Sequence, residues 1–366
     1  MSELKVIISG GGTGGHIFPA ISIANAVKEQ LPDAKILFVG AQGKMEMEKV
    51  PEAGYEIVGL PVAGLQRKVT LKNLSFPLKL IKSLAKARSV VKEFNPDVAV
   101  GVGGYASGPV LRVASQKGIP CLLQEQNSFP GVTNRILARK AAKICVAYDK
   151  MDRFFEAQKI ILTGNPVRSN LIASVDRKEA AEFWKLDPDK KTILVIGGSL
   201  GARSVNNGIL HGIDQLPEEC QLIWQTGKFY FEEMKAGLPE ELKGRVIVTD
   251  FISRMDMAFA MADVVVSRAG AGTISELAIL GKPTIFVPSP NVSEDHQTKN
   301  AMALVEKDAA MIVKDSQVKG IIHEASQLAL DEHLISNLAE NIKKLAKPDA
   351  AKDIAKEVIK LGKSKK

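Results

Sequence analysis

The chain has 366 residues, of which 45% are hydrophobic and 25% charged, as is normal for a globular protein of about two domains. No apolar run is long enough for a membrane-spanning helix, and the first residues lack the pattern of a signal peptide. The net charge of +8 suits nucleic acid, anionic lipid or phosphorylated substrates, but only 5% of the residues are aromatic, so we expect no nucleic-acid partner. Cys121, Cys145 and Cys220 show neither metal nor disulfide spacing, which predicts a reducing cytoplasm.

Short apolar runs alternate with amphipathic segments along the first half of the chain. The runs at 4–10, 34–40, 97–104 and 119–126 are typical of buried strands, and residues 16–30 carry apolar side chains at helical spacing. Strands that alternate with helices predict a parallel sheet with helices on both faces.

The same pattern begins again near residue 191. We therefore expect two Rossmann-like domains, 1–163 and 164–344, and an amphipathic helix within 345–366 that packs back on the first domain. The strand-like runs of the second half lie within residues 191–202, 221–227, 245–252, 262–270 and 282–290.

Four glycine-rich turns follow predicted strands, at residues 10–15, 101–108, 197–202 and 267–276. A glycine turn that opens a helix directs backbone N–H groups at an anion, and the helix dipole adds to the attraction. One such turn is common in any α/β protein. Two in each half, at the carboxyl ends of strands, favour a phosphate-binding cleft between two domains.

The first glycine turn also fits the dinucleotide pattern G-x-G-x-x-G through Gly10, Gly12 and Gly15. That fingerprint requires an acidic residue at the end of the second strand, and this strand ends at Gly40 and Ala41. An NAD-dependent oxidoreductase is therefore disfavoured. The phosphate-loop lysine motif and metal-binding clusters are absent from the sequence, so we expect neither a cofactor nor a metal.

Two titratable residues accompany these turns. His16 follows the first turn at the start of a helix, where the dipole favours a neutral imidazole that can accept a proton. The alternative for His16 is a hydrogen bond to the neighbouring backbone. Glu276 lies one helical turn beyond the fourth glycine turn, where it could bind a ribose diol or act as a capping carboxylate.

A basic amphipathic segment spans residues 67–92. Leu74, Leu78, Ile81 and Leu84 are predicted on one helical face, surrounded by lysine and arginine. Packing on its own domain and docking on an anionic membrane both fit this pattern. Each basic residue near such a membrane contributes about 1 kcal/mol to binding.

Seven motifs occur in a fixed order along almost the whole chain: "GGTGGHIFPA", "GVGGYASGP", "EQN", "GNPVR", "GGSLGAR", "SRAGAGTISE" and "DHQTKNA". Together they closely resemble the MurG family, the undecaprenyl-diphospho-muramoylpentapeptide N-acetylglucosaminyltransferases of bacterial peptidoglycan synthesis. The resemblance implies an α/β protein of the GT-B fold, with the parallel sheets of two Rossmann-like domains facing across a cleft. It implies an acceptor- and lipid-binding first domain and a second domain that binds the UDP-sugar.

The resemblance also implies a reaction. N-acetylglucosamine would be transferred with inversion from UDP-N-acetylglucosamine to the C4 hydroxyl of lipid I, giving lipid II without a cofactor. His16 is implied as the catalytic base. Acceptor binding is implied for Gly11, Gly12, Gly103, Gly104 and Tyr105. Donor binding is implied for Thr13, Gly14, Gly15, Asn127, Arg168, Ser199, Ile252, Ala271, Gly272, Thr273, Glu276 and Gln297.

Within the donor set, Ser199 and the amides of 271–273 are implied to hold the diphosphate. Glu276 is implied to bind the ribose, the backbone of Ile252 the uracil, and Gln297 the sugar hydroxyls. The sequence departs from some relatives at Gln124, where they have histidine.

A lipid-linked acceptor and the basic segment 67–92 together predict a peripheral protein on the cytoplasmic face of the inner membrane. The partners implied are UDP-N-acetylglucosamine, lipid I, the anionic membrane surface and other cell-wall synthesis proteins. A non-enzymatic nucleotide- or lipid-binding module and a glycolipid synthase with another acceptor remain the alternatives. His16, together with Glu276 and Gln297, favours an enzyme over a binding module.

Overall fold

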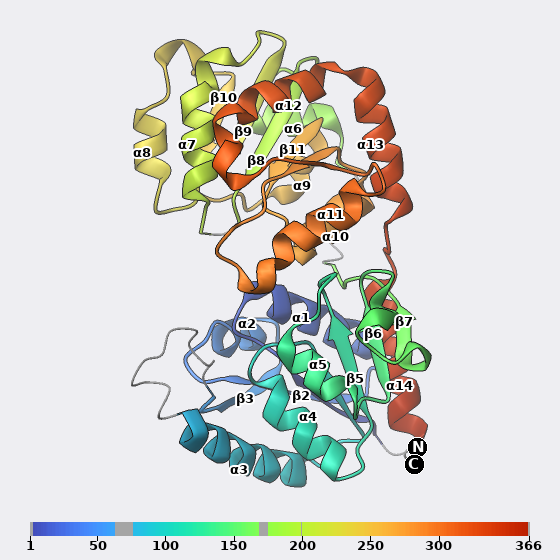
Figure 1. Ribbon diagram of the computed structural model, residues 1–366. Coiled ribbons are helices and arrows are strands. Elements are labelled where there is room, and N and C mark those ends of the chain that lie inside the picture. Colours follow the sequence, from blue (N-terminus) through green and yellow to red (C-terminus); the bar gives the residue numbers. More distant parts are fainter. Residues whose placement is uncertain (1–2, 63–75, 168–174, 199, 365–366) are drawn as a thin grey trace. The chain divides into compact units, whose positions relative to one another are not determined.

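The computed structural model shows two compact units along the chain. Met1–Val167 and Lys347–Lys366 form the first unit, and Arg168–Ala346 forms the second. Each unit has a parallel sheet between layers of helices, as the alternating pattern predicts (Figure 1). The described residues are 3–62, 76–167, 175–198 and 200–364. No helix within these ranges is both long enough and apolar enough to cross a membrane.

The sheet of the first unit has seven strands in the order β3-β2-β1-β4-β5-β6-β7. The strands are short and rich in valine and isoleucine, which is typical of parallel strands buried on both faces. They are β1 (Lys5–Ser9), β2 (Lys35–Ala41), β3 (Glu56–Leu60), β4 (Val98–Gly101), β5 (Cys121–Glu125), β6 (Lys143–Val146) and β7 (Ile160–Leu162).

Helices cover both faces of this sheet. The helices of the first unit are α1 (Gly14–Gln30), α2 (Glu46–Glu52), α3 (Phe76–Phe94), α4 (Ser107–Gln116), α5 (Val132–Ala138) and α14 (Ala350–Ser364). Val6 and Ile8 of β1 point into a core shared with α1 and α14, whereas Ile7 points into a second core shared with α3, α4 and α5. The alternation along β1 thus divides the apolar side chains between two faces.

The C-terminal helix α14 completes the core around α1. Ile354 and Val358 are fully buried in the same cluster as Ile23 and Val27 of α1. The first and last segments of the chain therefore share one hydrophobic core, and the second unit is inserted between them in sequence.

The sheet of the second unit has six strands in the order β10-β9-β8-β11-β12-β13. They are β8 (Lys191–Ile196), β9 (Cys220–Gln225), β10 (Val246–Thr249), β11 (Val264–Ser267), β12 (Thr284–Phe286) and β13 (Met311–Ile312). The helices are α6 (Arg177–Trp184), α7 (Arg203–Gly212), α8 (Phe231–Ala236), α9 (Met255–Met261), α10 (Ala271–Leu280), α11 (His296–Val305), α12 (Ile321–Leu330) and α13 (Glu332–Lys344). The buried Trp224 of β9 donates its indole N–H to Asn206 of α7 at 3.0 Å.

Both sheets reverse their strand order between two central neighbours, β1 and β4 in the first unit and β8 and β11 in the second. The carboxyl ends of strands at such a switch point are where open α/β sheets bind ligands. The four glycine turns predicted from the sequence follow these four strands. The fold thus places one pair of glycine turns at the switch point of each unit.

The packing of α14 yields a stability prediction. Ile354→Ala removes a fully buried side chain from the core of the first unit, and we expect a loss of about 2–5 kcal/mol in the free energy of unfolding of that unit. Urea unfolding followed by circular dichroism measures this loss. Both tryptophans lie in the second unit, so their fluorescence serves as an internal reference.

Lys356→Ala, on the exposed side of α14, is the matched control and should change stability by less than about 0.5 kcal/mol. Equal effects of Ile354→Ala and Lys356→Ala would contradict the assignment of α14 to this core.

Candidate functional site

The two glycine turns of the first unit pack backbone against backbone. A Cβ at Gly104 would overlap the carbonyl oxygen of Gly11, and a Cβ at Gly10 would overlap the side chain of Val102. Gly104 also has a φ of +82°, which L-residues with side chains rarely adopt. Gly10 and Gly104 are therefore glycines because the two turns approach each other too closely for side chains.

Other glycines of the first turn leave open space. A Cβ at Gly12 would meet no atom within 4 Å, and one at Gly15 would meet only Thr13 Oγ1, at 3.7 Å. Both residues are exposed. From the sequence, every glycine of this turn was expected to leave the backbone bare for a ligand. The geometry is consistent with that reason only at Gly12 and Gly15.

His16 lies at the junction of the two turns. Thr13 precedes α1 as its N-cap, and the backbone N–H groups of His16 and Ile17 donate to the Thr13 carbonyl at 3.1 and 3.2 Å. Thr13 Oγ1 lies 3.1 Å from His16 Nδ1. A Cβ at Gly103 would lie 2.8 Å from His16 Nε2, so the imidazole packs on the bare backbone of the second turn.

The contact with Thr13 bears on the chemistry of the ring. When Nδ1 carries the hydrogen and donates to Thr13 Oγ1, Nε2 holds the lone pair and can accept a proton. The opposite tautomer would make Nε2 a donor. The proposed role of His16 as a base therefore requires Thr13 Oγ1 to accept a hydrogen bond from Nδ1.

A buried carboxylate, Glu125 at the end of β5, organises the loop that carries Asn127. Its oxygens accept hydrogen bonds from the backbone N–H and the side-chain amide of Asn127, from Gly131 N and from Asn134 Nδ2, at 2.8–3.3 Å. Burial raises the pKa of Glu125, and these hydrogen bonds oppose the shift. Of this motif only Asn127 was predicted as a site residue from the sequence, and the role of Glu125 was not.

A row of amides continues from this carboxylate to the second glycine turn. Gln126 Nε2 donates to the carbonyl of Val102 at 2.7 Å and also bonds Gln124 Oε1. Gln124 Nε2 donates to Asn165 Oδ1 at 2.9 Å. The glutamine that stands in place of a histidine in some relatives thus takes part in a buried network that ties β5 to Val102, directly before Gly103.

The start of α10 is the main feature of the second unit. Gly270 is its N-cap, and no acidic residue occupies its first turn. First-turn N–H groups of a helix have no acceptor within the helix, and they lie at the positive end of its dipole. A Cβ at Gly272 would meet no atom within 4 Å, so the first turn is open here. Glu276 follows in the second turn and is half-buried.

Arg268 holds this turn in place, a role not predicted from the sequence. Its guanidinium donates to Asp315 Oδ1 at 2.6 Å and to Ser204 Oγ at 2.8 Å. It also donates to the carbonyls of Val287 and Pro288, at 2.9 and 3.2 Å. One side chain thus joins the turn before α10 to the start of α7 and to the segment after β12. The only sequence signal was an arginine directly after an apolar strand.

Two further predicted donor residues have defined surroundings. Gln297 Oε1 accepts from Ser289 N at 2.8 Å, so a ligand at this side chain would meet its amide NH₂. The side chain of Ile252 is buried, so a ligand there would meet its backbone. Arg168, Ser199 and Leu74 lie outside the described residues.

Tyr105, in the second glycine turn, is 55% exposed.

Burial raises the pKa of the Cys121 and Cys145 thiols to about 12, so neither is suited to act as a nucleophile. Within the ranges that the structure describes, no group of three or more His, Cys, Asp or Glu side chains is arranged to hold a metal ion.

The structure corrects the expectation that Leu84 shares one helical face with Leu78 and Ile81. Leu78 and Ile81 of α3 are 64% and 63% exposed, but Leu84 is half-buried against the core beneath α3, in line with the buried Ala87 and Val91. Leu84 therefore does not share the exposed apolar face. Its position lies one turn before Ala87, on the inner side of the helix.

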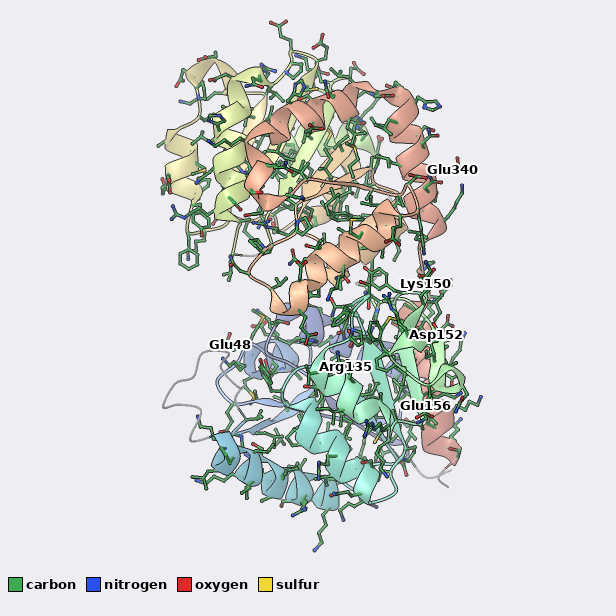
Figure 2. The ribbon with its side chains drawn as sticks, in the orientation of Figure 1. Glu48, Arg135, Lys150, Asp152, Glu156 and Glu340 are labelled. Carbon is green, nitrogen blue, oxygen red and sulfur yellow. The ribbon has the colours of Figure 1, made fainter. Side chains whose placement is uncertain are left out.

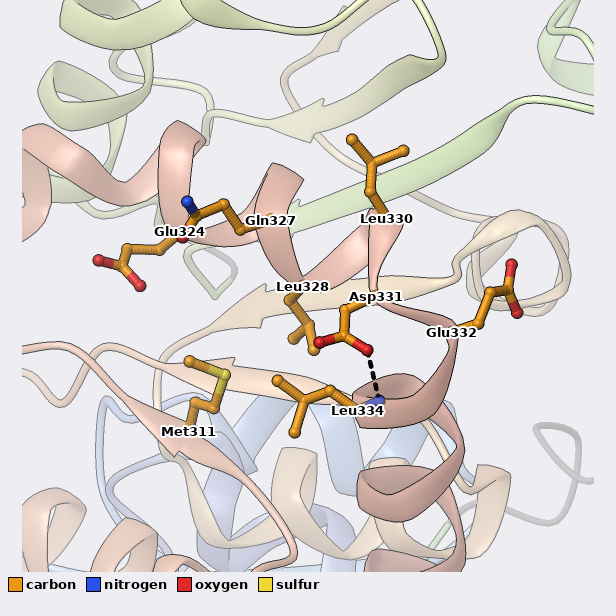
Figure 3. Close-up of a pocket in the computed structure, with 8 residues that line it drawn as sticks. All are labelled: Met311, Glu324, Gln327, Leu328, Leu330, Asp331, Glu332 and Leu334. Carbon is orange, nitrogen blue, oxygen red and sulfur yellow. Dashed lines mark hydrogen bonds between the residues drawn. The ribbon is translucent and has the colours of Figure 1, made fainter.

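A separate hollow of about 680 Å³ lies in the second unit between α12, α13 and β13 (Figure 3). Asp331 accepts from Leu334 N at 2.9 Å as the N-cap of α13, and Glu332 is paired with Lys191. Two of the carboxylates that line it thus have structural partners. None of the predicted site residues that the structure describes lines this hollow.

Two parallel-sheet units with glycine turns at both switch points are features of the GT-B glycosyltransferases. Residues 6–146 match the glycosyltransferase family 28 N-terminal domain, and residues 192–358 match the glycosyltransferase family 28 C-terminal domain. The chain belongs to glycosyltransferase family 28.

Relatives cover nearly the whole chain. A protein of Bacteroides thetaiotaomicron is 57% identical, with 98% of both chains covered, and one of Phocaeicola vulgatus is 58% identical, with 98% and 96% covered. Both are named UDP-N-acetylglucosamine--N-acetylmuramyl-(pentapeptide) pyrophosphoryl-undecaprenol N-acetylglucosamine transferase. The crystal structure of Acinetobacter baumannii MurG matches with a TM-score of 0.80 at 27% identity, covering 98% of this chain and 99% of that one.

The packing of the glycine turns yields a matched pair of variants. Gly104→Ala and Gly12→Ala both place a side chain at a similar φ, +82° and +88°, at a cost of about 1–2 kcal/mol each. Only Gly104→Ala also meets the backbone of Gly11, so we expect it to cost a further ~1–3 kcal/mol. Urea unfolding measures both losses. Equal stabilities of the two variants would contradict the close packing of the turns.

Proposed function

We propose that this chain transfers N-acetylglucosamine from UDP-N-acetylglucosamine to the C4 hydroxyl of lipid I (undecaprenyl-diphospho-N-acetylmuramoyl-pentapeptide) with inversion, forming lipid II in peptidoglycan synthesis. The observation that carries the proposal is the 57–58% identity to transferases of that name over nearly the full length of both chains. The glycine turns at both switch points supply the local chemistry that such a reaction requires.

The first unit is proposed to bind the acceptor. The C4 oxygen attacks C1 of the donor sugar, the C1–oxygen bond to the diphosphate breaks, and the hydroxyl proton passes to His16 Nε2. This step requires the tautomer in which Nδ1–H donates to Thr13 Oγ1, 3.1 Å away, and Nε2 is unprotonated. The open backbone at Gly12 lets the acceptor approach the start of α1, and the open backbone at Gly15 lets the donor sugar approach it.

The second unit is proposed to bind the donor. The N–H groups at the start of α10 stabilise the charge that develops on the departing UDP. Glu276 accepts hydrogen bonds from the ribose hydroxyls, and the NH₂ of Gln297, oriented by Ser289, donates to a sugar hydroxyl. The backbone of Ile252 pairs with the uracil edge.

Transfer of labelled N-acetylglucosamine to a lipid I analogue tests the proposal. The wild-type chain should form product from UDP-N-acetylglucosamine and give the β-anomer from the α-linked donor, as NMR of the product shows. His16→Ala should lower kcat by about 10²–10⁴, because the general base is lost, while UDP still binds.

His211→Ala removes an exposed imidazole from α7 and is the matched control; its kcat should equal that of the wild type. Near-normal kcat of His16→Ala at saturating acceptor would remove His16 from the chemistry. No transfer by the wild type to any lipid-linked muramoyl acceptor would contradict the function itself.

Donor binding has its own test. Glu276→Ala should weaken UDP binding by about ten- to a hundredfold, because hydrogen bonds between a charged group and the ribose are lost. Isothermal titration calorimetry measures the affinity. Glu340→Ala removes an exposed carboxylate from α13 of the same unit (Figure 2) and should leave the UDP affinity unchanged. An unaltered UDP affinity in Glu276→Ala would exclude the ribose contact.

We further propose that α3 docks the protein on the anionic cytoplasmic face of the inner membrane. Leu78 and Ile81 lie three residues apart, on one side of the helix, and both are exposed. The exposed basic residues beside them on this helix are Lys79, Lys82, Lys86 and Arg88. An apolar strip with a basic border is the composition that binds anionic lipid surfaces.

Replacing Leu78 and Ile81 by serine together should lower binding to phosphatidylglycerol-containing vesicles by about tenfold or more, because two apolar side chains no longer enter the bilayer surface. Co-sedimentation measures the binding. Leu162→Ser with Leu330→Ser, which removes two exposed leucines elsewhere, should bind as the wild type does. Identical binding of the α3 variant and the wild type would contradict the docking proposal.

A further inference from the structure

Glu46, the first residue of α2, is a buried carboxylate that none of the preceding roles uses. Its side chain is 1% exposed. Oε1 accepts a hydrogen bond from Ala41 N at 2.9 Å, and Oε2 accepts one from Gly12 N at 3.0 Å. One carboxylate therefore joins the end of β2 to the first glycine turn.

Two glycines make room for this side chain. A Cβ at Gly11 would overlap the Glu46 carboxylate, and a Cβ at Gly40 would overlap its Cγ methylene. On its other side, Gly11 lies against Gly104 of the second turn. The Gly11 peptide is thus held between the Glu46 carboxylate and the backbone of the second turn.

The burial of Glu46 is costly, since a carboxylate removed from water must be compensated by hydrogen bonds or an opposite charge. In the part of the chain that the structure describes, the compensation comes from the two backbone amides. An apolar side chain of similar size would avoid the cost, but it could not hold the Gly12 N–H. The arrangement therefore favours a role in shaping the turn.

Glu46 also bears on the dinucleotide pattern that the first turn fits only in part. The sequence shows no acid at the end of the second strand, yet Glu46, at the start of the next helix, returns its carboxylate to that strand end. It fills the space beside Gly11 and takes the Gly12 N–H, so this side of the turn is closed by the protein itself.

We propose that Glu46 is a positioning residue for the proposed transfer reaction. It holds the 10–13 turn so that Thr13 starts α1 and His16 packs on Gly103, and it does not contact substrate. Its effect on catalysis rests on the proposed function, whereas its effect on the turn does not.

The turn is tested first, by hydrogen–deuterium exchange of the full chain. Glu46→Gln keeps the size of the side chain, but its NH₂ must face one of the two N–H donors, so one hydrogen bond is lost. Exchange in the segment around residues 10–16 should become about tenfold faster. Glu48→Gln, an equal charge change on the exposed side of the same helix, should leave that exchange unchanged (Figure 2).

Steady-state kinetics test the effect of Glu46 on the proposed transfer reaction. Glu46→Gln should lower kcat by about tenfold at saturating acceptor, because His16 is less well placed, with UDP affinity within about twofold of wild type. If Glu46→Gln does not fold, Glu46→Asp is used: it keeps the charge but is too short to reach both amides, and the same changes are expected.

The outcomes separate the two proposals. Unchanged exchange around 10–16 in a folded Glu46 variant overturns the positioning role, whatever the activity. Faster exchange with unchanged kcat also overturns it, because the turn would then move without effect on the chemistry. Faster exchange in a chain that transfers no sugar would leave the turn as described and contradict the proposed function instead.

Discussion

The close approach of two glycine turns in the first unit is the constraint on which its candidate site depends. β1 and β4 are neighbours at the switch point of the sheet, so the turns that follow them must pass each other. They do so only because Gly10 and Gly104 carry no side chains, whereas Gly11 is bare because the Glu46 carboxylate fills the space beside it. The imidazole of His16 packs on the bare backbone of Gly103 in the second turn, and the open side of the first turn lies at Gly12 and Gly15.

Each unit holds one of its glycine turns in place with a charged side chain. In the first unit Glu46 accepts backbone N–H groups, and in the second Arg268 donates to backbone carbonyls and to Asp315. A turn rich in glycine has little conformational preference of its own. The charged side chain therefore supplies the rigidity that glycine removes, and the space beside Gly12 and Gly272 stays open.

The sequence predicted the central strands and all four glycine turns, because apolar runs and glycine clusters are strong local signals. It missed β3, β6, β7 and β13, which have two to five residues each and lie toward the sheet edges. It also missed Glu46, Glu125 and Arg268, whose roles arise from contacts between distant segments. Leu84 was misplaced because helical spacing alone does not say which side of α3 faces the sheet.

The central claim is that the packed turns hold His16 with Nδ1 donating to Thr13 and Nε2 ready to accept a proton. Nitrogen-15 NMR of the histidine side chains tests it most directly. The chain has five histidines, and a His16→Gln variant identifies the signal of His16. The account predicts that the neutral ring of His16 carries its hydrogen on Nδ1, with Nε2 unprotonated. A neutral ring with its hydrogen on Nε2 would contradict it.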